Sequence, residues 1–170
     1  MSTRDTLRIV GNGTQKWNAK GTYGVSLAQI PVSLASGYGV YNGANQLVAG
    51  TWSWEPENSS SASGIYPNVE DNKAYTVKFT PTDSSASYDR TLTDSVVPEI
   101  SKYQLQLSSV AGEDKTYDGT TTATVQQPFM IDTGVNTAAG NEKLQITGLT
   151  AAFNNANAGS DKEVVIDASK

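Results

Sequence analysis

Three tryptophans are the side chains of this sequence best suited to contact a ligand. Trp52 and Trp54 stand two positions apart, so an extended strand places both indoles on one face. A flat aromatic pair can stack on sugar rings, whereas core packing in a thin β-sandwich is the favoured alternative. Trp17 lies in the polar run 15–18, and we expect it to be exposed. Trp17, Trp52 and Trp54 are therefore the candidate ligand-binding residues.

Three loops rich in carboxylates and amides could supply oxygen ligands to a metal ion. They span residues 68–72, 132–136 and 154–161. Calcium binds six to eight oxygens, which loops of this kind can provide. None of them has the Asp-x-Asp-x-Asp-Gly spacing of a dedicated calcium loop. Solvated turns explain them better, so we predict no metal ligand and no cofactor, with calcium as the alternative.

The composition disfavours catalysis. The chain of 170 residues has no histidine and no cysteine, which removes the commonest general base, thiol chemistry and disulfides. Glycoside hydrolysis needs two carboxyl groups roughly 5–10 Å apart, and no acid pair stands out. The Gly-Asn-Gly at 11–13 lacks the rest of a phosphate-binding loop. We predict no catalytic residue and no enzymatic activity.

A lysine–asparagine crosslink is a further reaction to consider. It requires a lysine desolvated enough to lose its proton. Alternation turns Lys78 away from Val77 and Phe79, and Lys102 and Lys143 also fall on solvent-facing positions. We therefore expect no crosslink at these lysines.

The net charge of −5 disfavours two classes of partner. Nucleic acids and anionic lipid surfaces both attract basic patches, so we predict no nucleic-acid binding. No segment approaches the roughly 20 apolar residues that span a bilayer, so we also predict no membrane insertion.

Apolar residues alternate with period two in several short runs, which is the pattern of half-buried strands. The runs are 51–54, 75–79, 103–107, 143–146 and 163–166. Glycine and proline interrupt nearly every longer window, so we predict an all-β fold. A proline after the last strand of the first half, at Pro98, suggests a boundary between domains at 1–98 and 99–170. Two domains of this size fit small β-sandwiches.

The run 115–125 combines a turn with a strand. Asp118-Gly119 tolerates positive φ, and the threonine-rich stretch that follows places Ala123 and Val125 on one face. This run resembles the signature of the YDG module, a repeat of large bacterial surface proteins and adhesins. The stretches 148–153, 157–159 and 162–164 extend the resemblance.

The first half resembles another module of the same surface proteins, the bacterial Ig-like repeat of the MBG type. The matching stretches are 21–27, 49–54 and 75–83, followed by Tyr88. The two resemblances imply tandem small β-sandwich (Ig-like) domains, with a β-grasp arrangement as the alternative for the second. They also imply that the chain is part of a longer secreted protein, located at the cell surface or in the cell wall.

The YDG-type module normally continues with a further strand, often ending in Asn-Tyr-x-Leu, which this sequence does not show. We therefore expect an incomplete second domain that could self-associate through its sheet edge. The resemblance implies a non-catalytic stalk or adhesion segment, whose partners are neighbouring modules of the same polypeptide and, further, glycans or host proteins. A carbohydrate- or host-protein-binding module and an accessory domain of a secreted glycoside hydrolase are the alternatives.

Overall fold

The computed structural model describes residues 4–56, 61–105, 112–125 and 129–167. Its regular structure consists of short β-strands and two 3-10 turns, and this described part contains no α-helix. The predicted all-β class is thus confirmed. Within the same ranges, no helix has the length and apolar character needed to cross a membrane.

The chain divides into two compact units. Unit 1 comprises Met1–Tyr103 with Val135–Gly140, and unit 2 comprises Gln104–Gly134 with Asn141–Lys170. The strands up to residue 103 are β1 (Arg8–Gly11), β2 (Trp17–Asn18), β3 (Lys20–Thr22), β4 (Ser33–Leu34), β5 (Tyr38–Tyr41), β6 (Gly50–Trp54), β7 (Tyr75–Pro81), β8 (Thr93–Val96) and β9 (Glu99–Ser101); the 3-10 turns are η1 (Leu27–Gln29) and η2 (Ala62–Gly64).

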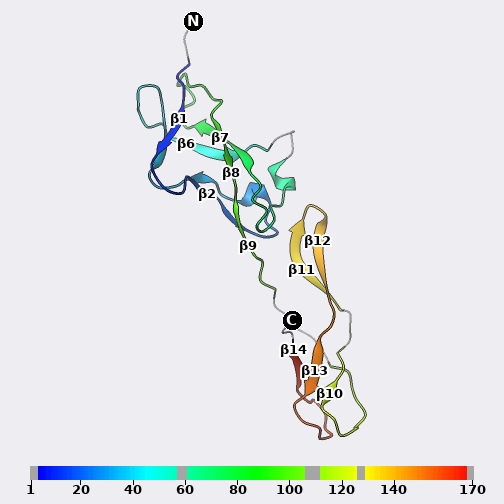
Figure 1. The fold of residues 1–170 in the computed structure, drawn as a ribbon. Coiled ribbons are helices and arrows are strands. Elements are labelled where there is room, and N and C mark those ends of the chain that lie inside the picture. The colour runs from blue at the N-terminus through cyan, green and yellow to red at the C-terminus, as the bar shows by residue number, and fades with distance from the viewer. Residues whose placement is uncertain (1–3, 57–60, 106–111, 126–128, 168–170) are drawn as a thin grey trace. The chain divides into compact units, whose positions relative to one another are not determined.

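The antiparallel sheet β6-β7-β8 organises the core of unit 1 (Figure 1). Strict alternation along β7 buries Tyr75, Val77 and Phe79 on one face, as the sequence pattern predicted. Tyr75 and Val77 belong to one apolar cluster, which also contains Leu27 and other residues of the loops. Phe79 belongs to a second cluster, with Leu7, Val40 and Val48. One strand therefore holds two small cores together.

β9 pairs in parallel with a strand near the start of the chain. β9 pairs with β3 in the register Lys20↔Glu99, Gly21↔Ile100 and Thr22↔Ser101. Backbone bonds continue at both ends of the pair: the Glu99 N–H donates to the Ala19 carbonyl at 2.8 Å, and the Tyr23 N–H donates to the Ser101 carbonyl at 2.9 Å. β9 follows the predicted boundary at residue 98 yet pairs with a strand of the first half. The division at 98 and 99 stays a prediction.

Unit 2 is built on the antiparallel sheet β10-β13-β14, drawn from yellow-green to red in Figure 1. The strands are β10 (Thr122–Ala123), β13 (Thr150–Phe153) and β14 (Val164–Asp167). Ala123 and Val125 are buried, which confirms the half-buried alternation predicted after the Tyr-Asp-Gly turn. β11 (Phe129–Thr137) and β12 (Gly140–Ile146) form a separate antiparallel hairpin. The strand predicted at 163–166 is present within one residue as β14, and the strand predicted at 143–146 lies within β12, which begins three residues earlier.

The strand predicted over residues 103–107 is not found. Tyr103, Gln104 and Leu105 are exposed and outside any strand, while residues 106 and 107 lie outside the described residues. No strand of the described ranges pairs with Tyr103–Leu105. Alternation alone does not make a strand, because the ladder needs a neighbour to accept and donate its hydrogen bonds.

Candidate functional site

The structure packs Trp52 and Trp54 against the core of unit 1. Both lie on the same face of β6 and are half-buried. The Trp54 Nε1 donates to the Ile30 carbonyl at 2.8 Å, and its ring meets Tyr75 edge-on with 6.4 Å between centroids. The Trp52 ring lies 5.2 Å from Phe79. These contacts give both indoles a structural role, and a ligand role for them stays a prediction.

Trp17 is half-buried, so the expected exposure is wrong. In the β2–β4 pair Trp17 stands opposite Leu34, and its indole meets Trp52 edge-on with 4.7 Å between ring centroids. The Trp17 Nε1 is buried and has no hydrogen-bond partner among the described residues. The polar neighbours in sequence misled the prediction, because the side chains flanking a strand residue point to the opposite face.

The Tyr-Asp-Gly motif forms a loop that is held by its own side chains. Lys115 Nζ donates to the Thr120 hydroxyl at 2.6 Å, to the Thr122 carbonyl at 2.8 Å and to the Thr120 carbonyl at 3.3 Å. The same ammonium lies 2.8 Å from Asp118 Oδ1. Gly119 has a φ of +75°, which confirms the positive-φ turn predicted from Asp118-Gly119. We call residues 112–120 the motif loop.

Asp118 accepts three interactions on one carboxylate oxygen. Besides the lysine, the Thr120 N–H donates to Oδ1 at 2.9 Å and the Thr120 hydroxyl donates to it at 2.8 Å. The hydrogen bond from Lys115, followed by those from Thr120, lowers the pKa of the Asp118 carboxyl from 3.8 to about 2. The carboxylate is therefore ionised across the neutral pH range, and its role in the loop is that of an acceptor.

A second loop, residues 153–162, is held in the same manner. Lys162 Nζ donates to the Asn155 carbonyl at 2.8 Å, to Asn155 Oδ1 at 2.5 Å and to the Asn157 carbonyl. The Asn157 N–H donates to Asn155 Oδ1 at 3.0 Å, which closes a tight turn beneath the ammonium. We call this segment the asparagine loop.

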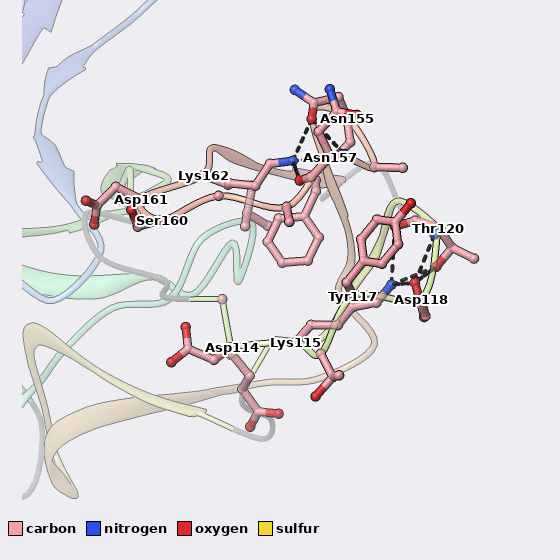
Figure 2. Close-up of a pocket in the computed structure, with 18 residues that line it drawn as sticks. Asp114, Lys115, Tyr117, Asp118, Thr120, Asn155, Asn157, Ser160, Asp161 and Lys162 are labelled. Atoms are coloured by element: carbon pink, nitrogen blue, oxygen red, sulfur yellow. Dashed lines mark hydrogen bonds and ion pairs between the residues drawn. The ribbon is translucent and has the colours of Figure 1, made fainter.

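The two loops line an open pocket of about 570 Å³ within unit 2. Figure 2 shows the two sides: Lys162, Asn155 and Asn157 on one, and Lys115, Tyr117, Asp118 and Thr120 on the other. Phe153, at the end of β13, is half-buried and contributes an apolar surface to the lining. The volume is within the range of roughly 300–1,000 Å³ of small-molecule sites.

The pocket leaves some polar groups available and others engaged. Both lysines are bound to oxygens of their own loops. Asp114, Asp161 and the Tyr117 hydroxyl line the pocket and have no partner among the described residues. Tyr117 is 68% exposed, the largest exposure of any tyrosine in the described part of the chain. The available groups thus include two carboxylates and the phenol of Tyr117, whose ring is exposed.

The loops considered for calcium show the contacts of ordinary turns. Asp132 Oδ1 accepts the Gly134 N–H at 3.0 Å, and the asparagine loop places its oxygens on Lys162. In the described ranges, no group of three or more His, Cys, Asp or Glu residues is arranged to hold a metal ion.

The lysines considered for a crosslink face solvent, as predicted. Lys78 Nζ lies 3.7 Å from Glu55 Oε1 in a solvent-exposed ion pair, and Lys102 and Lys143 are exposed.

Sequence reasoning missed the pocket, although it had singled out both segments that form it. The sequence signal for this pocket is the spacing between each lysine and its acceptors. Lys115 donates to residues five and seven positions after it, and Lys162 donates to residues five and seven positions before it. Each bracketed segment also contains a side chain that accepts from its own backbone two residues on, Asp118 or Asn155. A lysine bracketing such a turn indicates a closed loop.

Comparison with known proteins identifies the second half of the chain. No curated protein and no solved structure matches the sequence. Residues 100–170 match the family model of the YDG domain. The match confirms the predicted YDG-type module, whereas the Ig-like module of the first half stays a prediction. The segment 100–170, which contains the two lysine-held loops, is therefore similar to the YDG domain.

Proposed function

We propose that this chain is a non-catalytic structural or adhesive segment of a bacterial extracellular surface protein. The match of residues 100–170 to the YDG domain supports this proposal. The sequence of this segment resembles a repeat of bacterial surface proteins and adhesins, in which such modules have structural or adhesive roles. In this role the partners of the segment are the neighbouring modules of the same polypeptide. We further propose that residues 1–98 form an Ig-like module in tandem with it.

The observation that supports a mechanical role is the parallel pairing of β9 with β3. β9 is the strand through which the chain leaves the first 103 residues. Tension toward the C-terminus pulls β9 along its own axis against β3. The ladder bonds of two parallel strands are spaced evenly along the pair, so sliding must break them together. This geometry resists extension better than strands that peel apart bond by bond.

A sugar platform on Trp52 and Trp54 receives less support. The edge-on contacts with Trp17 and Tyr75 and the bond from Trp54 to Ile30 tie both indoles to the core of unit 1 and support packing over ligand binding. Their contribution to this segment is packing.

Self-association through unit 2 also belongs to the proposal. β14 pairs with β13 on one side, and no strand of the described ranges pairs with its other side. An edge of this kind can accept a strand from a neighbouring module or another copy of the chain.

Antibodies raised against residues 1–170 test the cellular location. We expect them to label intact, unpermeabilised cells of the source bacterium, and we expect external protease to remove the signal. A cytoplasmic protein followed in parallel should be protected from the same protease. Labelling that appears only after permeabilisation would contradict the extracellular role.

A further inference from the structure

The pocket between the motif loop and the asparagine loop has the composition of a saccharide site, and we infer that it binds a neutral saccharide. Carbohydrate recognition combines an aromatic ring, which contacts the C–H face of a sugar, with polar groups that bond its hydroxyls. Tyr117 supplies an exposed ring at this pocket, and Asp114 and Asp161 supply available carboxylates. The inference gives a ligand class to the adhesive part of the proposed function and rests on that proposal only for its biological setting.

The charges in the pocket select against anions. Lys115 is paired with Asp118, and Lys162 is bound to three oxygens of the asparagine loop, so neither ammonium is available to a ligand without breaking its loop. The other charged residues that line the pocket, Glu113, Asp114 and Asp161, are all acidic. Phosphates and acidic sugars would meet like charge, whereas the hydroxyls of a neutral sugar can donate to these carboxylates.

A basic peptide is the competing ligand for an acidic pocket, and the lining favours a sugar over it. Phe153 and the Tyr117 ring provide apolar surfaces, and Asn155, Asn157 and Ser160 add amide and hydroxyl groups. A saccharide offers matching C–H faces, donors and acceptors on every ring, whereas a lysine side chain uses only the acidic groups. Pairing with two exposed carboxylates contributes little by itself.

The loops do not need to be ordered by the ligand. Each is closed by its own lysine and by a carboxylate or amide that accepts a backbone N–H within the loop. Binding to preformed loops avoids the loss of conformational entropy that flexible loops would undergo. This advantage matters most for weak ligands such as sugars.

Glycan-array screening of the labelled chain, followed by 1H–15N NMR titration, tests the inference. The probes are neutral disaccharides, namely cellobiose, lactose, maltose and N,N′-diacetylchitobiose, with sialyllactose as the anionic probe and an acetylated tetralysine peptide as the basic one. We expect at least one neutral glycan to bind and to shift amides of both loops in a saturable manner. The inference would be overturned if none of the neutral glycans bound. It would also be overturned if only tetralysine or only sialyllactose bound in a saturable manner.

Variants locate the binding surface. Tyr117→Ala should weaken the binding of the neutral glycan at least tenfold, whereas Tyr117→Phe should retain most of it because the ring remains. Tyr103→Ala is the matched control, since Tyr103 is also an exposed tyrosine and does not line the pocket. Unchanged amide dispersion shows that each variant is folded. If Tyr117→Ala and the parent chain bound the neutral glycan with equal affinity, the inference would be overturned. The proposed extracellular role would still stand, because the labelling of intact cells tests it separately.

Discussion

Lys115 and Asp118 meet at 2.8 Å across a single turn, and the same lysine continues to the carbonyls of Thr120 and Thr122. The acid of the Tyr-Asp-Gly motif is therefore an internal acceptor of its own loop. Tyr117, between the two in sequence, is exposed. The motif thus joins a fixed turn to an available aromatic ring.

The Asp118 carboxyl should titrate with a pKa of about 2 in the folded chain, against 3.8 for an unperturbed aspartate. A lowered pKa stabilises the folded state above pH 3.8, and this contribution disappears as the pH falls through about 2. Lys115→Met should raise the Asp118 pKa toward 3.8, because the largest cause of the shift is removed, while the Thr120 bonds retain part of it. NMR titration of the carboxyl carbon measures both values. An unchanged pKa in Lys115→Met would contradict the assigned cause.

Trp54→Phe should destabilise the chain more than Trp17→Phe. Both changes replace an indole with the smaller phenyl ring. Of the two indoles, only that of Trp54 donates a hydrogen bond, at 2.8 Å to the Ile30 carbonyl. Losing the partner of a buried carbonyl costs about 1–3 kcal/mol. Trp17→Phe removes a buried N–H that has no partner among the described residues, which offsets part of its packing loss. Urea unfolding of the two variants gives the comparison, and equal or reversed losses would be inconsistent with this account.

Glu99→Pro should weaken the β3–β9 closure. It removes the N–H that donates to the Ala19 carbonyl at 2.8 Å, and we expect a loss of about 1–3 kcal/mol in the free energy of unfolding. Under force, the first unfolding event should occur at lower tension.

Glu99→Ala is the matched control for this change. It keeps the backbone bond and removes only the exposed ion pair with Lys20, where N and O are 3.5 Å apart. Such a pair contributes about 0–1 kcal/mol. Urea unfolding and single-molecule pulling report on the two variants, and a Glu99→Pro chain as stable as Glu99→Ala would show that β9 carries no load.

Gly119→Ala should destabilise unit 2 through the backbone alone. At a φ of +75° a residue with a side chain costs roughly 1–2 kcal/mol, and an added Cβ would meet no atom within 4 Å. Gly159→Ala, in the asparagine loop, places its Cβ at an ordinary 3.9 Å from Lys162 without a positive φ and should be nearly neutral. Hydrogen exchange of amides in β10 and β13 reads out the difference. Similar protection in both variants would argue against the turn as the cause.

Much of the fold follows from local patterns. The alternation in Tyr75, Val77 and Phe79 predicts a strand with one buried face, and neighbours on both sides make it the centre of its sheet. A similar alternation begins at Tyr103, but Tyr103–Leu105 form no strand, because no strand of the described ranges pairs with them. Periodicity records which face could be buried, whereas pairing depends on residues far away in the sequence.

The pocket was less predictable than the strands. The turn at Gly119 could be foreseen from Asp118-Gly119, since only a few residue types tolerate positive φ. The approach of the asparagine loop depends on β10 and β14 both pairing with β13, which no local pattern reveals. The predicted exposure of Trp17 was wrong for a similar reason, because Trp17 packs against Trp52, which lies 35 positions later in the chain.

Lys162 gives the asparagine loop a cation that is covalently attached to the chain. Its ammonium occupies the centre of three oxygens, from Asn155 and Asn157, in the manner of an ion held by a carbonyl cage. A loop of this design does not exchange its cation with the medium. Its shape is consequently insensitive to chelators and to the mineral content of the surroundings.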